Sequence, residues 1–152
     1  MDDYGYTIRP LTDGDLPEWL RLRQLLWDQA SVAEHEDEMA DVIEHPETQQ
    51  VFVAEDTSHR LVGFLEAGIR SWAEDCISDQ IGYIEGWYVE PGHRRHGIGR
   101  SLATAAEQWA SAVGCYEMAS DTEIGNEEGI EAHRGLGYEE TSRLVHLRKS
   151  LQ

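Results

Sequence analysis

Basic residues are scarce in this chain of 152 residues. Twelve lysines and arginines stand against 30 aspartates and glutamates, so the formal net charge is −18. A surface of this charge repels nucleic acid, which argues against a nucleic-acid-binding protein. It attracts a cationic substrate and accelerates its capture. The same charge also fits a surface that serves solubility alone, and bulk charge does not decide between these two interpretations.

Cysteines and long apolar segments are few as well. Cys76 and Cys115 are isolated and form no Cys-x-x-Cys pattern, which argues against a zinc site and fits a reducing compartment. No segment reaches the roughly 20 apolar residues of a membrane helix. Met1 to Tyr4 show no basic and apolar run, so we expect no secretory signal. We therefore expect a cytoplasmic protein with one domain over residues 1–152, no metal site and no membrane partner.

One strand-loop-helix unit organises the chain. Residues 81–89 are rich in aromatic and β-branched side chains and predict a strand, and apolar residues at helical spacing over 98–113 predict a helix. The loop between them is rich in glycine and carries Arg94, Arg95 and Arg100, three of the twelve basic residues. Glycines let backbone N–H groups converge, and a helix start adds unpaired donors and partial positive charge. The unit therefore predicts an anion site, most often one for phosphate.

The remaining pattern completes a mixed fold. Further strands are predicted at residues 6–10, 51–55, 61–70, 116–120 and 141–147. Further helices are predicted from a cap at Thr12 or Asp13 to Trp27, from a cap at Ser31 onward, and over residues 130–136. Residues 71–80 form a polar loop long enough to act as a flap beside a substrate. This order predicts an α+β (mixed α/β) domain, with a mostly antiparallel mixed sheet and helices on both faces.

The anion loop lacks both the triphosphate P-loop pattern and the Gly-x-Gly-x-x-Gly dinucleotide pattern. Residues 94–99, Arg-Arg-His-Gly-Ile-Gly, instead resemble the Arg/Gln-x-x-Gly-x-Gly/Ala loop of the GNAT (Gcn5-related) N-acetyltransferases. In that family the loop binds the pyrophosphate of acetyl-CoA, so the resemblance implies acetyl-CoA as co-substrate. The alternative is a glycine-rich turn that caps an ordinary helix.

Longer segments are similar to the aminoglycoside 6'-N-acetyltransferases within that family. The similar segments span nearly the whole chain in order: 22–27, 67–70, 85–91, 115–122 and 133–141. The resemblance implies the GNAT acyl-CoA N-acyltransferase fold and a cytosolic enzyme, usually dimeric. It also implies transfer of an acetyl group to the 6'-amine of aminoglycoside antibiotics, which confers resistance.

The family's contacts carry over to named positions of this sequence. Implied cofactor contacts lie in three segments and comprise Trp87, Tyr88, Val89, Arg94, Arg95, His96, Gly97, Ile98, Gly99, Arg100 and Asn126. Implied aminoglycoside contacts are Trp27, Glu85 and Asp121. Two positions depart from the pattern. Trp72 replaces an aromatic of a longer loop, and Ser142 stands where relatives have Glu, so one acidic contact is missing or has moved to Glu139 or Glu140.

The expected chemistry follows from the substrate's amines. Carboxylates at Glu85 and Asp121 would bind ammonium groups by charge-assisted hydrogen bonds. An ammonium cannot attack a thioester, so one amine must lose its proton to a carboxylate or through a water chain. Asp121 is our first choice for that base, or for the residue that orients the amine, and Glu85 is the second. Backbone N–H groups near residues 87–89 would polarise the thioester carbonyl, and the amine would attack directly in a ternary complex.

Two other functions stay open at this point. One is acetylation of a polyamine or another small cationic amine, with drugs as incidental substrates. The other is a CoA-binding module without turnover, in which Glu85 and Asp121 would be ordinary exposed acids.

Overall fold

The computed structural model describes residues 5–152, so the prediction made for residues 1–4 lies outside the described residues. The described part contains a five-stranded sheet in the order β1-β2-β3-β4-β5. Its strands are β1 (Thr7–Pro10), β2 (Gln49–Glu55), β3 (Leu61–Arg70), β4 (Ile81–Val89) and β5 (Glu117–Ser120). The first four pair antiparallel with their neighbours, and β5 joins β4 in parallel. The predicted mixed, mostly antiparallel sheet is therefore confirmed.

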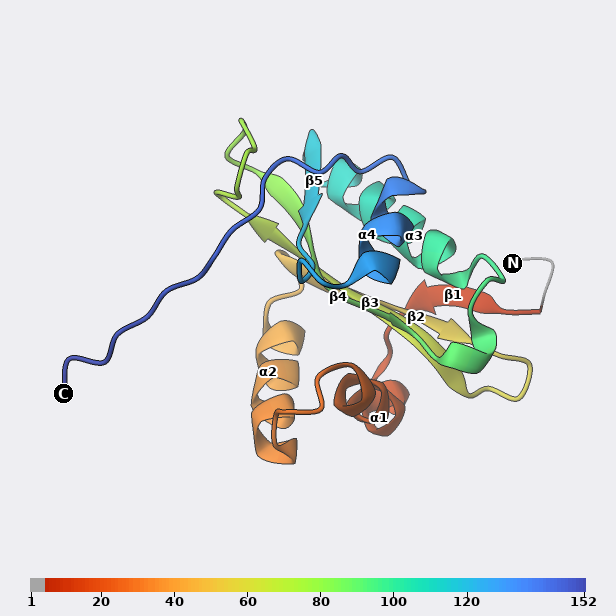
Figure 1. Ribbon diagram of the computed structural model, residues 1–152. Helices are drawn as coiled ribbons and strands as arrows, with labels where there is room; N and C mark the ends of the chain where they lie inside the picture. The colour runs from red at the N-terminus through yellow and green to blue at the C-terminus, as the bar shows by residue number, and fades with distance from the viewer. Residues whose placement is uncertain (1–4) are drawn as a thin grey trace.

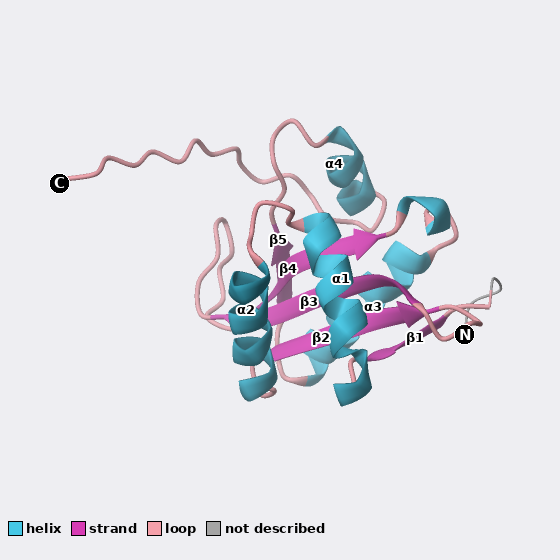
Figure 2. Cartoon of the chain, turned by 90° about the horizontal axis from the view of Figure 1, so that it is seen from below, coloured by secondary structure: helices cyan, strands magenta, loops and turns pink. Residues whose placement is uncertain are grey.

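Helices cover both faces of the sheet, as predicted (Figure 1). On one face lie α1 (Leu16–Leu26) and α2 (Val32–Glu44), which cross in front of the strands in Figure 2. On the other face lie α3 (Ile98–Ala112) and α4 (Glu127–Arg134). Short 3₁₀ turns, η1 (Asp13–Asp15) and η2 (Pro91–His93), precede α1 and α3. None of the helices formed by residues 5–152 is long and apolar enough to cross a membrane.

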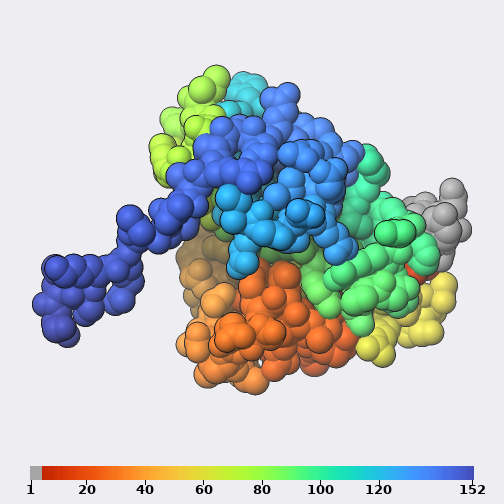
Figure 3. All heavy atoms as spheres, viewed as in Figure 1, coloured from red at the N-terminus to blue at the C-terminus, as the bar shows by residue number. Residues whose placement is uncertain are grey.

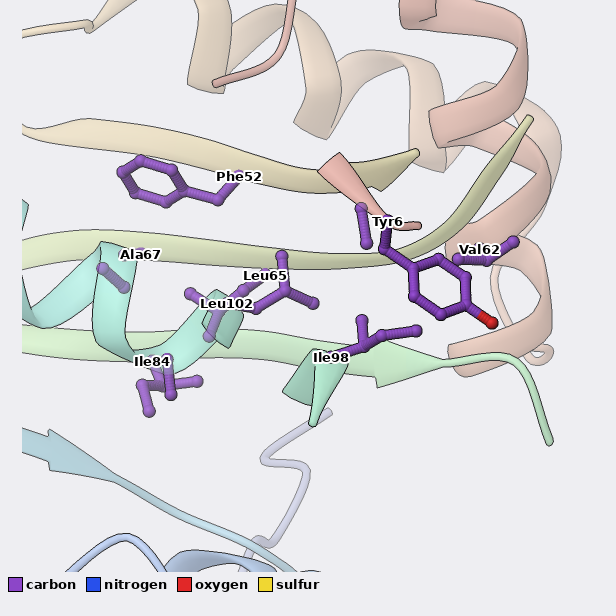
Figure 4. Close-up of a cluster of buried hydrophobic side chains, with 11 residues drawn as sticks. Tyr6, Phe52, Val62, Leu65, Ala67, Ile84, Ile98 and Leu102 are labelled. Carbon is purple, nitrogen blue, oxygen red and sulfur yellow. The ribbon is translucent and has the colours of Figure 1, made fainter. Parts of the chain in front are cut away.

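Two apolar layers hold the helices on the sheet. Between α3 and the sheet, Ile98 and Leu102 pack against Phe52, Leu65 and Ile84 (Figure 4). The opposite layer contacts the other face and contains Trp19, Leu22, Met39, Val51, Val53, Leu61 and Phe64. β3 is buried over eight successive residues because it lies in the middle of the sheet with helices on both sides. These layers hold β4 in place, and the candidate site lies on its C-terminal half, beyond the residues that pair with β5.

The boundaries of α4 differ from the prediction. The helix starts at Glu127, three residues before the predicted start, because the Asn126 side chain accepts a hydrogen bond from the Gly129 N–H at 3.0 Å and caps the first turn. It ends at Arg134, and Gly137 then takes a left-handed backbone with φ of 94°.

The predicted last strand over residues 141–147 is wrong. From Glu139 to Gln152 the chain has no regular secondary structure and is exposed throughout. Figures 1 and 3 show this C-terminal arm leaving the body of the molecule. Alternating apolar residues form a strand only beside another strand, because an isolated strand leaves its backbone unpaired. Here Leu144, Val145 and Leu147 are 53%, 83% and 91% exposed.

Candidate active site

The candidate site begins where β4 and β5 separate. Their parallel pairing runs from Ile81 with Glu117 to Ile84 with Ser120, and among the described residues no strand pairs with β4 beyond that point on this side. The Glu90 N–H bonds to the Val62 carbonyl of β3 at 2.9 Å. Because antiparallel strands alternate paired and unpaired positions, the N–H groups of Trp87 and Val89 point into the gap instead. The gap thus offers free backbone donors along one strand edge, enough to bind an extended amide chain.

The glycine-rich loop closes the far end of this gap. Arg95 and Gly97 both have left-handed backbones, with φ of 66° and 80°, and Gly97 caps the start of α3. Such alternating conformations turn successive N–H groups toward one point, beside the partial positive charge of a 15-residue helix. The Ile98 side chain is buried in the core, so only its backbone can take part. The loop has the geometry of an anion site.

Arg94, Arg95 and Arg100 are exposed, and Arg94 and Arg100 each donate to a backbone carbonyl. Arg94 Nε donates to the Val89 carbonyl at 2.7 Å, and Arg100 Nη2 donates to the Gly135 carbonyl at 2.8 Å. Arg94 also lies 3.5 Å from the Glu128 carboxylate, and the Tyr6 hydroxyl lies 3.3 Å from Nδ1 of His96. Carbonyl bonds thus hold the Arg94 and Arg100 guanidinium groups beside the loop, and Glu128 offsets part of the Arg94 charge.

Trp87 and α4 lie between the glycine-rich loop and β5 and connect them through side-chain contacts. The Trp87 indole N–H donates to the Gly99 carbonyl at 3.1 Å and packs edge-on against His133. His133 in turn lies 2.7 Å from the Ser120 hydroxyl, at the end of β5. Asn126 is occupied in capping α4, and its amide N–H also donates to the Thr122 hydroxyl at 2.9 Å.

Glu85 lies at a β-bulge. On β3, Glu66 pairs with Gly86 and Ala67 pairs with Ile84, so Glu85 is the extra residue of β4. Glu85 is the one exposed residue of the strand, and its carboxylate lies beside Gly68 of β3, where an added Cβ would lie 3.3 Å from it. Its carboxylate accepts two hydrogen bonds from Arg70, at 2.9 Å from Nε and 2.6 Å from Nη2.

Asp121 follows β5 directly and accepts a hydrogen bond of 2.5 Å from the Tyr83 hydroxyl. Burial and the Asp121 carboxylate raise the pKa of Tyr83 well above its usual range, so the phenol remains a donor at neutral pH. The Arg70 guanidinium lies 3.5 Å from the Tyr83 ring centroid. The two predicted carboxylates are therefore joined through Tyr83 and Arg70 at one edge of the sheet.

Trp27 ends α1 and fills a notch in β4. A Cβ at Gly86 would lie 2.3 Å from the Trp27 ring, so glycine is required there for the ring to take this position. The Arg23 guanidinium lies 4.7 Å from the ring centroid. Trp27 borders a pocket of about 510 Å³ whose lining is rich in acids: Asp28, Glu34, Glu38 and Glu123. This lining suits a ligand with positive charges, which the carboxylates attract, and with an apolar face, which the Trp27 ring can contact.

Trp72 and Ser142 lie at the periphery. The Trp72 side chain is 66% exposed in the 71–80 loop. Ser142 lies in the C-terminal arm, where its hydroxyl and that of Thr141 lower the pKa of the Asp75 carboxyl by hydrogen bonding. The arm is thus tied to the same loop that carries Trp72.

Neither cysteine thiol is activated as a nucleophile. Burial raises the pKa of the Cys115 and Cys76 thiols, which leaves both protonated at neutral pH. Tyr138 packs against the core and donates to Glu107 at 2.6 Å. Within residues 5–152, no cluster of three or more His, Cys, Asp or Glu side chains could hold a metal ion.

Sequence reasoning missed Arg70, Tyr83 and Glu38 as neighbours of the site. Tyr83 precedes Glu85 by two residues on a predicted strand, which puts both on one face and could have signalled their proximity. Arg70 ends the preceding strand of an antiparallel pair, yet its contact with Glu85 depends on the register between the two strands, which no local pattern specifies.

Comparison with known proteins identifies the family to which this fold belongs. Residues 19–138 match the model of the Acetyltransferase (GNAT) family. The chain is 38% identical to aminoglycoside N(6')-acetyltransferase type 1 of Klebsiella aerogenes, over 98% of this chain and 99% of that protein. Among solved structures it is similar to AAC(6')-Iy in complex with the bisubstrate analogue CoA-S-monomethyl-acetylneamine, with a TM-score of 0.90, 31% identity, and coverage of 95% and 98% of the two chains. It is also similar to the 6'-N-acetyltransferase AAC(6')-Ih of Acinetobacter baumannii, with a TM-score of 0.89, 32% identity, and coverage of 97% and 100%.

Proposed function

Because the chain belongs to the GNAT acetyltransferase family, we propose that it transfers the acetyl group of acetyl-CoA to the 6'-amine of aminoglycosides and so confers resistance. One observation carries the proposal. Along the open edge of β4, the anion loop (residues 94–100) lies beside an acidic rim, which is formed by the carboxylates of Glu85 and Asp121. The anion loop suits a diphosphate, and the rim suits a substrate with several ammonium groups.

The co-substrate is expected to bind along the gap between β4 and β5. The N–H groups of Trp87 and Val89 would bond to its pantetheine arm, with Tyr88 between them on the same strand. The turn from Arg94 to Arg100, with the N–H groups that His96, Gly97, Ile98 and Gly99 contribute, would hold the pyrophosphate. Asn126, at the start of α4, would lie near the reacting end.

The aminoglycoside is expected to bind beside this gap, between Trp27 and the carboxylates. Trp27 offers an apolar face, and Glu85 and Asp121 offer acceptors for ammonium groups. Asp121 takes the proton from the attacking amine, since its hydrogen-bond partner Tyr83 is uncharged whereas Glu85 is neutralised by Arg70. Trp72 and Ser142 would contact the drug only at the edge of the site. The raised pKa values of both cysteine thiols support direct attack without an acetyl-enzyme.

Thiol release tests this proposal. Free CoA thiol is measured after mixing the protein and acetyl-CoA with kanamycin, and the position of the new acetyl group is mapped by NMR. Drug-dependent thiol and a 6'-N-acetyl product are the expected results. Normal acetyl-CoA binding without drug-dependent thiol would contradict the proposal. A higher kcat/KM for spermidine than for kanamycin would point to a polyamine acetyltransferase instead.

Replacement of Gly97 by valine is expected to weaken acetyl-CoA binding by about tenfold or more, because a β-branched residue at φ of 80° is strained by about 1–2 kcal/mol or more. Gly92→Ala is the matched control in the same loop, since a Cβ there meets no atom within 4 Å. Calorimetric titration with CoA measures both, and thermal melting confirms folding. Equal affinities for the two variants would argue against the loop as the diphosphate site.

We further propose that two copies associate and that the protein, a single domain over residues 1–152, works in the cytoplasm. Support for a dimer comes from the exposed apolar residues of the arm and from β5, which lies at the edge of the sheet. An edge strand has unpaired backbone groups, so the arm of a second copy can pair with it. Sedimentation of the full chain should give a dimer mass, and truncation after Tyr138 should give a monomer. A monomeric full chain would contradict this assembly.

A further inference from the structure

Arg70 brings a positive charge into the acidic rim, where the proposed function places a cationic substrate. It bonds to both carboxylate oxygens of Glu85 and lies over Tyr83, whose hydroxyl bonds to Asp121. Glu85 and Tyr83 from β4 and Asp121 after β5 are the titratable groups that interact with the guanidinium. One cation therefore lies between the two carboxylates that the substrate uses.

Fold stability does not account for this pair. The Arg70 and Glu85 side chains are 41% and 37% exposed, and ion pairs exposed to this degree stabilise a protein by only about 0–1 kcal/mol. Their exposure also leaves the remaining lone pairs of Glu85 accessible to a substrate ammonium. The pair therefore needs an explanation other than stability.

The reaction makes opposite demands on charge. Two carboxylates bind an ammonium well, but they also hold its proton, and only the neutral amine attacks a thioester. A nearby guanidinium weakens the hold of the site on the ammonium and favours the neutral amine. Such a residue raises the energy of the bound ground state relative to the transition state, which increases kcat at the expense of affinity.

We propose that Arg70 is a built-in cation that limits how tightly the acidic rim binds ammonium groups and promotes loss of the proton from the reacting amine. The inference rests on the proposed function. It separates the roles of the carboxylates, because Glu85 shares its charge with Arg70 whereas Asp121 accepts the proton.

Substitution R70Q tests the proposal, since glutamine removes the charge and keeps a polar side chain. For kanamycin we expect KM to fall by about threefold to tenfold, kcat to fall by a similar factor at pH 7, and the kcat profile to move to higher pH by about half a unit to one unit. The substitution R70K keeps the charge without the two-pronged bonding. It should keep the wild-type pH profile. Arg70→Ala gives the same charge change if the glutamine variant misfolds.

Several outcomes would overturn the inference. A raised KM with an unmoved pH profile in R70Q would mean that Arg70 only holds Glu85 in position. Equal pH shifts in R70K and R70Q would mean that charge is not the cause. If the wild-type protein releases no drug-dependent thiol, the proposed function itself fails. Wild-type turnover with no change of KM or pH profile in R70Q refutes only the role of Arg70.

Discussion

Asp121→Asn is expected to lower kcat for kanamycin by about a hundredfold or more, because general bases typically contribute 10² to 10⁴ in rate. Asparagine still accepts the hydrogen bond from the Tyr83 hydroxyl, so the local structure should be preserved. Binding of acetyl-CoA should stay within about twofold of wild type, since Asp121 lies outside the anion loop. Steady-state kinetics and CoA titration measure the two effects separately.

A matched control removes the same charge nearby. Glu127 lies six residues further along the chain, exposed in the first turn of α4, and Glu127→Gln should leave kcat within about twofold. Glu85→Gln should mainly raise KM, because Glu85 contributes binding rather than proton transfer. If Asp121→Asn keeps a third or more of the wild-type kcat, the proton leaves by another route, and Glu85 becomes the leading candidate.

The anion loop could be predicted from the sequence because its determinants are local. Glycine at position 97 and the apolar spacing from Ile98 onward specify a turn and a helix start without reference to the rest of the chain. The order of strands and helices follows from similar local patterns. The predictions of the central sheet and the family are accordingly confirmed, and the predicted helix start lies at Ile98, whereas the anion-binding role of the loop stays a prediction.

The arrangement around the carboxylates could not be predicted in the same way. Glu85 meets Arg70 because of the register of β3 against β4, and that register depends on both strands at once. The predicted strand in the C-terminal arm is wrong for a related reason. Its alternating pattern is that of a strand, but pairing requires a neighbour that the sequence pattern does not specify.

A buried ionic network below Trp27 also escaped sequence reasoning. Arg23 is 1% exposed and pairs with Glu66, which is 6% exposed and also accepts a 2.9 Å hydrogen bond from the Trp19 indole. Arg23 further bonds to His35 at 3.2 Å, and His35 lies 3.1 Å from the Trp27 carbonyl. Polar residues on an amphipathic helix usually face solvent, so Arg23 gave no local sign of burial.

Replacement of Arg23 by methionine is expected to lower the free energy of unfolding by about 3–5 kcal/mol at pH 7.5, because it leaves Glu66 as an unpaired buried charge. Burial raises the pKa of Glu66, and Arg23 opposes that rise. Without Arg23, the folded pKa of Glu66 lies still further above the unfolded one. The folded variant then binds a proton that the unfolded chain does not, so its stability should recover as pH falls from 7.5 toward 5.

Urea unfolding at several pH values measures this recovery, and a double variant identifies its cause. Arg23→Met with Glu66→Gln keeps an acceptor for the Trp19 indole but removes the buried charge, so it should regain most of the lost stability and lose the pH dependence. A loss below about 1 kcal/mol in the single variant would show that water solvates Glu66 once Arg23 is gone. Equal instability of the single and double variants would mean that Arg23 acts by packing against Trp27 rather than by charge.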